Sequence, residues 1–203
     1  MSRFGAIFRE FLRAPNKIGA VAASSARLAN SMLDEIDWQA AQNIVEYGPG
    51  TGAITRHLVQ RLNSNQRFFA VELNPRLIEQ LNQRLPDVKV LNDSVANIRE
   101  MCDGQEMPFI DGIISGLPWT AFPARLQNEL LDAMFSVLGE HGQFVTFAYL
   151  HGLPLKSAKR FRQVLEERFA EVTVSPVVWR NLPPAVFYSC RRSSAGLPAG
   201  RST

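Results

Sequence analysis

A short glycine-rich turn between an apolar run and a helical pattern constrains the fold of this chain most strongly. The run "NIVEY" (43–47) predicts a strand, and Gly48, Gly50 and Gly52 follow it at every second position. Glycines in such a turn allow positive φ and let a ligand approach the backbone closely. The usual dinucleotide turn is G-x-G-x-x-G, which seats a pyrophosphate on a helix N-terminus. The tighter spacing here therefore points to a different ligand.

Strand patterns alternate with helical patterns along the rest of the chain, which predicts a mostly parallel sheet covered on both faces. We expect a Rossmann-like, doubly wound α/β domain whose seven-stranded sheet has one antiparallel strand. Ligands of such sheets bind beyond the carboxyl ends of the strands, where the strand order reverses, so the glycine loop should lie there. The predicted strands are 43–47, 67–73, 88–92, 111–116, 142–150, 171–179 and 185–190, and the predicted helices are 53–62, 74–85, 95–102, 123–138 and 157–169.

Acidic residues stand at or near the ends of the first three predicted strands. Glu72 lies 20 residues after Gly52, where a carboxylate can accept hydrogen bonds from both hydroxyls of a ribose. Asp93 ends the third strand, where a short acid can accept from an exocyclic amine. Glu46 lies two residues before Gly48, and its charge would repel phosphates but favour a cationic group. S-adenosylmethionine, an adenosine cofactor with a sulfonium and an ammonium, fits all three acids.

Four ordered segments, "VEYGPGTG", "AVELNP", "LNDS" and "IISGLPW", resemble the motifs of class I S-adenosylmethionine-dependent methyltransferases. The resemblance covers residues 18–190 and implies S-adenosylmethionine as cofactor, S-adenosylhomocysteine as product and no metal. The predicted cofactor-binding residues are Glu46, Tyr47, Gly48, Gly50, Thr51, Gly52, Glu72, Leu73, Asn74, Asp93, Ser94, Ser115 and Leu117.

Three further segments are similar to the short bacterial phospholipid N-methyltransferases: "IGAVAASSARLA" (18–29), "SGLPW" (115–119) and "VWRNLPPA" (178–185). This similarity implies methyl transfer to the amine of a membrane lipid head group. Phosphatidylethanolamine, methylated towards phosphatidylcholine, is the first expected substrate, and an ornithine lipid presents a similar primary amine.

An rRNA adenine-N6 methyltransferase is the alternative, because that family shares the fold and the order of motifs. Those enzymes carry an Asn or Asp before Pro-Pro and an aromatic residue, whereas this chain has Ser115 before "GLPW". A net charge of only +3 is also low for a nucleic-acid protein of this size. We therefore do not expect a nucleic-acid partner.

The acceptor ammonium must lose a proton before it can attack, so the site needs a base or a path to water. Tyr149 and His151 follow the fifth predicted strand in "FAYLHGLP" and are the catalytic candidates, although a histidine with a plain surface role would look the same. Trp119 is expected to wall the substrate cavity or else to pack in its loop, and Arg180 is expected near the substrate or the membrane.

The segment "FGAIFREFLRAP" places Phe4, Phe8 and Phe11 on one helical face, with arginines elsewhere. This amphipathic helix could lie in the interface of an anionic membrane or pack on the protein as a lid. No apolar run reaches the roughly 20 residues that span a bilayer. The N-terminus lacks the apolar core of a secretory signal, and two distant cysteines suit a reducing compartment.

We therefore expect a cytoplasmic protein, peripherally associated with the inner face of the cytoplasmic membrane. Residues 1–30 are expected to form amphipathic or lid helices, residues 31–190 the methyltransferase domain, and residues 191–203 a disordered tail.

Overall fold

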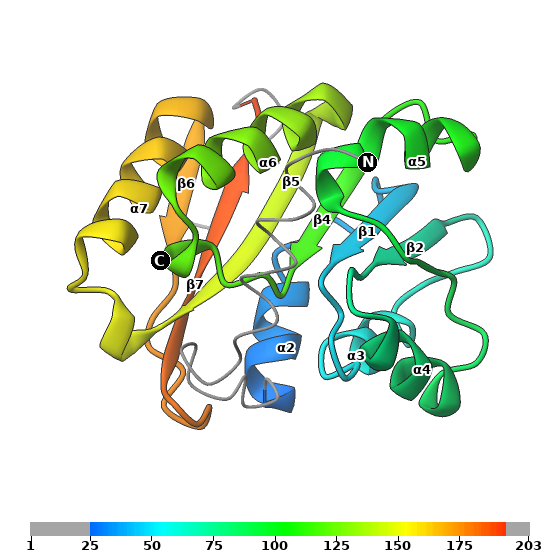
Figure 1. Cartoon of the computed structure of the whole chain (residues 1–203), viewed down its shortest axis with the longest axis horizontal. Coiled ribbons are helices and arrows are strands. Elements are labelled where there is room, and N and C mark those ends of the chain that lie inside the picture. The colour runs from blue at the N-terminus through cyan, green and yellow to red at the C-terminus, as the bar shows by residue number, and fades with distance from the viewer. Residues whose placement is uncertain (1–24, 194–203) are drawn as a thin grey trace.

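A seven-stranded sheet forms the centre of the computed structural model, which describes residues 25–193 (Figure 1). The strand order is β3-β2-β1-β4-β5-β7-β6, and only β7 runs antiparallel to its neighbours. The predicted doubly wound sheet with one antiparallel strand is thereby confirmed. The strands are β1 (Asn43–Tyr47), β2 (Arg67–Val71), β3 (Val90–Leu91), β4 (Ile110–Ser115), β5 (Leu138–Tyr149), β6 (Glu171–Val174) and β7 (Ala185–Arg191).

Helices cover both faces of this sheet, and side chains alternate between the two apolar layers along each strand. On β4, Ile113 packs in the layer of α5, α6 and α7, whereas Ile114 packs in the layer of α2 and α3. The same alternation places Phe144 and Val145 of β5 in opposite layers. Strands buried on both faces are typical of parallel sheets. The helices are α2 (Ala26–Leu33), α3 (Thr55–Leu58), α4 (Pro75–Arg84), α5 (Ile98–Gly104), α6 (Ala124–Val137) and α7 (Lys156–Arg168).

Local sequence signals explain several element boundaries. The Asn74 side chain caps α4 by accepting from the Arg76 N–H, and Pro75 occupies the first helical position, as the sequence predicts. The strand predicted over 171–179 ends at Val174, because Pro176 has no N–H to offer a neighbouring strand.

Two further elements differ from their predicted ranges, namely the helix α3 and the start of β5. Helix α3 covers only part of the predicted 53–62 and has no side-chain cap at its start. Helix α6 ends at Val137, and β5 begins at the next residue without a loop.

Helix α2 crosses the predicted domain boundary at residue 30. Its first turn is capped by the Ser25 hydroxyl, and its buried residues include Leu28, Met32 and Leu33. These side chains belong to the core of the main domain, so α2 is an integral part of it. The predictions for Phe4, Phe8 and Phe11 and for a helix before residue 25 lie outside the described residues, as does the predicted 191–203 tail beyond residue 193. The first residues of that predicted tail are ordered, because Arg191 ends β7 and the Arg192 N–H donates to the Gly142 carbonyl at 3.0 Å. Between residues 25 and 193 no helix is both long and apolar enough to cross a bilayer.

Candidate active site

The order of the sheet reverses between β1 and β4, and the glycine loop lies at the carboxyl ends of these two strands. The Gly116 N–H donates to the Tyr47 carbonyl at 2.8 Å, and the Gly48 N–H donates to the Val71 carbonyl at 2.9 Å. A Cβ on Gly116 would lie only 2.6 Å from the Gly48 carbonyl oxygen. The loops after β1 and β4 therefore touch backbone to backbone, at the place where ligands of doubly wound sheets bind.

The three glycines of the loop all have left-handed backbone conformations, with φ values of +67° at Gly48, +57° at Gly50 and +85° at Gly52. A Cβ on Gly48 or Gly52 would come within 2.6 Å of Leu117 Cδ2 or Leu81 Cδ1 respectively. Around a Cβ on Gly50, by contrast, no atom lies within 4 Å. The outer glycines thus allow close packing, and the middle one leaves backbone open to a ligand.

Glu72 connects the glycine loop to the end of β2. Its Oε2 accepts the Gly50 N–H at 3.2 Å and its Oε1 accepts the Asn74 N–H at 2.9 Å, and the side chain is buried. Burial raises the pKa of Glu72, while backbone hydrogen bonds from Asn74, Gly50 and Leu73 oppose that rise. A carboxylate has about four acceptor positions, so these bonds leave room for the predicted ribose hydroxyls.

The end of β3 contributes a second set of polar groups beside Glu72. Asp93 Oδ1 accepts the Ser94 N–H at 2.6 Å and the Asn97 side-chain amide at 2.9 Å. The Asn92 amide donates to the Glu72 carbonyl at 3.0 Å, which holds the ends of β2 and β3 together. No role for Asn92 is predicted from the sequence. Its position directly before Asp93, at the end of a predicted strand, could have indicated one.

Glu46 has no solvent exposure, and neither of its carboxyl oxygens has a hydrogen-bond partner among the described residues. Burial raises the pKa of Glu46 to about 8, and the Glu72 charge adds to the rise. The nearby Thr55 hydroxyl lowers this pKa in part without reaching hydrogen-bond geometry. Buried polar groups are normally paired, so a group left unpaired calls for an explanation. A cationic ligand would satisfy Glu46.

The strand ends therefore fit the predicted cofactor. Glu46 offers an unpaired carboxyl to an ammonium, Gly50 offers open backbone, and Glu72 and Asp93 offer acceptors at successive strand ends. Within residues 25–193, no group of three or more His, Cys, Asp or Glu side chains is arranged to hold a metal ion.

Several of the predicted cofactor-binding residues are buried or form hydrogen bonds within the protein. Ser115 is buried, and its hydroxyl accepts from Trp119 Nε1 at 2.8 Å and from the Leu117 N–H at 3.3 Å. The Tyr47 side chain is also buried, so only its backbone reaches the loop. Thr51 is exposed, and its carbonyl accepts from the Arg84 guanidinium at 3.1 Å.

Trp119 does not wall a cavity. Its indole has no solvent exposure and stacks on Phe161 with ring centroids 5.5 Å apart. The apolar layer of α6 and α7 buries the ring, and the bond to Ser115 satisfies its N–H. Of the two predicted roles, the structure shows packing.

The catalytic candidates, Tyr149 and His151, lie at the carboxyl ends of the parallel strands, the same edge of the sheet that carries the glycine loop. Tyr149 ends β5, and its ring stacks on the exposed His151 ring with centroids 5.7 Å apart. Burial raises the pKa of Tyr149, so its phenol stays protonated at neutral pH. Arg180 is exposed in the connection between β6 and β7, which returns to the same edge.

Comparison with known proteins supports this assignment. Residues 23–97 match the family model described as "Ribosomal RNA adenine dimethylase". An O-methyltransferase from Bacillus cereus, solved with SAH, covers 95% of this chain and 92% of its own at a TM-score of 0.69 and 13% identity. Human methyltransferase-like protein 13 with SAH covers 85% and 84% at a TM-score of 0.64 and 17% identity. The chain has the fold of the class I S-adenosylmethionine-dependent methyltransferases, and S-adenosylmethionine is the cofactor of that class.

Three curated relatives differ in how much of this chain they match. The ornithine lipid N-methyltransferase of Singulisphaera acidiphila is 28% identical over 194 residues, which cover 94% of this chain and 97% of that protein. The ribosomal RNA small subunit methyltransferase A of Dehalococcoides mccartyi is 27% identical over 123 residues, or 59% of this chain and 40% of that protein. The dimethyladenosine transferase of Yarrowia lipolytica is 30% identical over 95 residues, or 45% and 28%. Only the first of these three matches extends over both whole proteins.

Proposed function

We propose that this protein transfers methyl groups to the primary amine of a membrane lipid head group, in phosphatidylethanolamine or an ornithine lipid. The observation that carries the proposal is the extent of the match to the ornithine lipid N-methyltransferase, 94% of this chain against 97% of that protein. The matches to the ribosomal RNA methyltransferase and to the dimethyladenosine transferase described above cover at most 59% of this chain. The family-model match, residues 23–97, includes the glycine loop, Glu72 and Asp93 and ends before β4.

The end of β4 supports a lipid amine over an adenine. The rRNA enzymes place an Asn or Asp there to accept from a planar amine, and this chain has Ser115. The Ser115 hydroxyl is buried and already accepts from Trp119 Nε1 and the Leu117 N–H. It therefore offers no equivalent acceptor to a base.

In the proposed reaction the chain positions two reactants and removes a proton. The bound cofactor supplies an electrophilic methyl group on a sulfonium. Glu46, Gly50 and Glu72 would hold it at the ends of β1 and β2, and orientation of this kind contributes much of the rate of a displacement. His151 would accept the proton of the lipid ammonium, with the Tyr149 ring fixing its orientation.

Labelled S-adenosylmethionine tests the acceptor. The protein is incubated in parallel with phosphatidylethanolamine, with ornithine lipid and with ribosomal RNA, and the label is counted in each. We expect label in a lipid, and label in RNA alone would overturn the proposal.

The Glu72→Ala variant tests the assigned role of Glu72 in cofactor binding. We expect calorimetry with S-adenosylhomocysteine to show a loss of affinity of roughly tenfold or more, since charged hydrogen bonds are worth about 1.5–3 kcal/mol. Unchanged affinity would refute the assigned role of Glu72.

An enzyme whose substrate is a membrane lipid must act at a membrane surface. We therefore also propose peripheral association with the inner face of the cytoplasmic membrane, which fractionation of cells expressing the tagged protein would test.

A further inference from the structure

Large apolar side chains are exposed at the edge of the sheet that carries the site. Trp179 and Leu182, in the connection between β6 and β7, are 71% and 82% exposed, and Leu155, at the start of α7, is 58% exposed. Both segments return to the carboxyl end of β5, where Tyr149 pairs with Ala185 and the Leu150 N–H donates to the Pro184 carbonyl at 2.8 Å. The lower side of Figure 1 shows the β6–β7 connection, α2 and the glycine loop along this edge.

Hydrogen bonds anchor the connection between β6 and β7 on both sides of its exposed apolar residues. Asn181 is buried, accepts the Ser25 N–H at 2.8 Å and donates to the Pro183 carbonyl at 2.7 Å. Val178 pairs with Ala185 through an isolated bridge. Because the residues on both sides of Trp179 and Leu182 are anchored, these two side chains protrude without the ordering cost of a loose loop.

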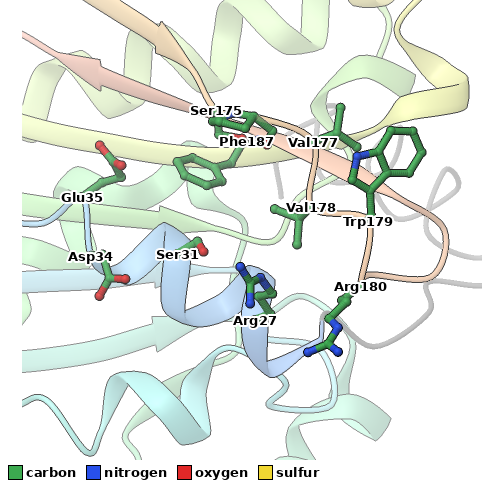
Figure 2. Close-up of a pocket in the computed structure, with 11 residues that line it drawn as sticks. Arg27, Ser31, Asp34, Glu35, Ser175, Val177, Val178, Trp179, Arg180 and Phe187 are labelled. Atoms are coloured by element: carbon green, nitrogen blue, oxygen red, sulfur yellow. Dashed lines mark hydrogen bonds between the residues drawn. The ribbon is translucent and has the colours of Figure 1, made fainter. Parts of the chain in front are cut away.

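Basic residues accompany the apolar ones. Trp179, Arg180 and Arg27 of α2 line a groove of about 520 Å³. Figure 2 shows Arg27 and Arg180 at one end of it, Trp179 farther along the same connection, and Asp34 and Glu35 at the other end. Neither arginine has an ion-pair partner among the residues that the structure describes, whereas Asp34 pairs with Arg61 at 2.8 Å.

Acidic residues are missing from the two segments that carry the exposed apolar side chains, 150–160 and 175–184. Leu155 is followed by the exposed Lys156, and neither 150–160 nor 175–184 contains an Asp or Glu. Exposed acids lie instead at the opposite edge of the sheet, where the parallel strands begin, and include Asp37, Glu106 and Glu140.

We propose that Trp179, Leu182 and Leu155 form an insertion surface for an anionic bilayer, with Arg27, Arg180 and Lys156 contacting lipid phosphates. Tryptophan favours the membrane interface because its ring is apolar and its N–H is polar. Basic side chains add attraction to an anionic surface. This surface rests on the proposed function, since it would bring the site edge to a substrate that stays in the membrane.

Tryptophan fluorescence of the full chain tests the insertion. The chain has three tryptophans, of which Trp119 is fully buried and Trp38 partly buried, so the emission of the exposed Trp179 responds most to a change of surroundings. On vesicles of phosphatidylcholine mixed with phosphatidylglycerol, we expect a blue shift and quenching by bromine on the lipid chains. The Trp179→Phe variant should lose both signals.

Sedimentation with the same vesicles tests the contribution of each group. Trp179→Ser with Leu182→Ser should weaken binding on the order of tenfold or more, because two large apolar groups lose their burial. Arg180→Gln with Lys156→Gln should reduce binding and its sensitivity to salt. Phe109→Ser and Lys89→Gln are the matched controls, since both residues are exposed at the opposite edge.

The outcomes separate this proposal from the proposed function, because these vesicles contain no methyl acceptor. If Trp179 stays fully accessible to an aqueous quencher on saturating vesicles, or responds to ribosomal RNA instead, the insertion surface is refuted. Methylation of lipid in detergent micelles would then still support the function. Insertion of Trp179 without methylation of any lipid would support the surface and refute the function.

Discussion

At the scale of single residues, the buried Glu46 carboxyl has opposite consequences for stability and for binding. Its folded-state pKa of about 8 lies above the ordinary 4.5, so the unfolded chain ionises first as pH rises. Folding stability is therefore lost between about pH 4.5 and pH 8, by at most about 1.4 kcal/mol per pH unit. The charged form is nevertheless the one that a cationic cofactor would select.

Glu46→Gln should remove this pH dependence. We expect its melting temperature to match that of the wild type near pH 4.5 and to exceed it increasingly towards pH 8, while affinity for S-adenosylhomocysteine falls. Thermal melts across this pH range measure the first effect, and the exposed Glu79→Gln is the control. A constant difference at every pH would contradict the assignment.

His151→Asn should lower kcat by about a hundredfold, in the range that general bases contribute, with little change in cofactor affinity. Tyr149→Phe keeps the ring that stacks on His151 and should cost less. Steady-state kinetics with the proposed lipid substrate measures both, with the exposed His141→Asn as control. Equal rates for the His151 and His141 variants would remove His151 from the mechanism.

At the scale of elements, the glycine loop predicts different outcomes for neighbouring substitutions. Gly50→Ala meets no atom within 4 Å, so it should cost only about 1–2 kcal/mol of folding stability for its left-handed φ, yet block the cofactor. Gly116→Ala would press on the Gly48 carbonyl at 2.6 Å and should destabilise the fold more. Denaturant unfolding and calorimetry separate the effects, and Gly104→Ala, with open space around it, is the control. Normal cofactor binding by Gly50→Ala would contradict the loop's role.

The same elements show what the sequence could and could not predict. The alternation of apolar runs, the glycine spacing and the Asn74 cap are local patterns, so they predicted the sheet, the loop and the start of α4. The bond from Gly50 to Glu72 joins residues 22 positions apart and depends on β1 lying beside β2. The burial of Trp119 depends on α7 closing over it through Phe161. Such contacts follow from strand order and helix packing, which no local pattern specifies.

At the scale of the whole molecule, the two cysteines report on global unfolding. Cys102 and Cys190 are both free and fully buried, and burial raises both thiol pKa values, that of Cys102 to about 11. The thiolate is the reactive form, so we expect no reaction with Ellman's reagent in the folded protein and reaction of both thiols in denaturant. Rapid labelling of either cysteine under native conditions would contradict the buried position.

The antiparallel direction of β7 has a consequence for the surface beside the glycine loop. It brings residues 175–184 to the edge built by β1 and β2, although these segments lie far apart in the chain. The family-model match ends at residue 97 and so covers the glycine loop but not this hairpin. The Ser25 N–H donates to Asn181 at 2.8 Å, so the start of α2 joins the matched half of the chain to this hairpin. Replacing residues 175–184 would therefore change the proposed insertion surface, while the glycine loop, Glu72 and Asp93 belong to other segments of the chain.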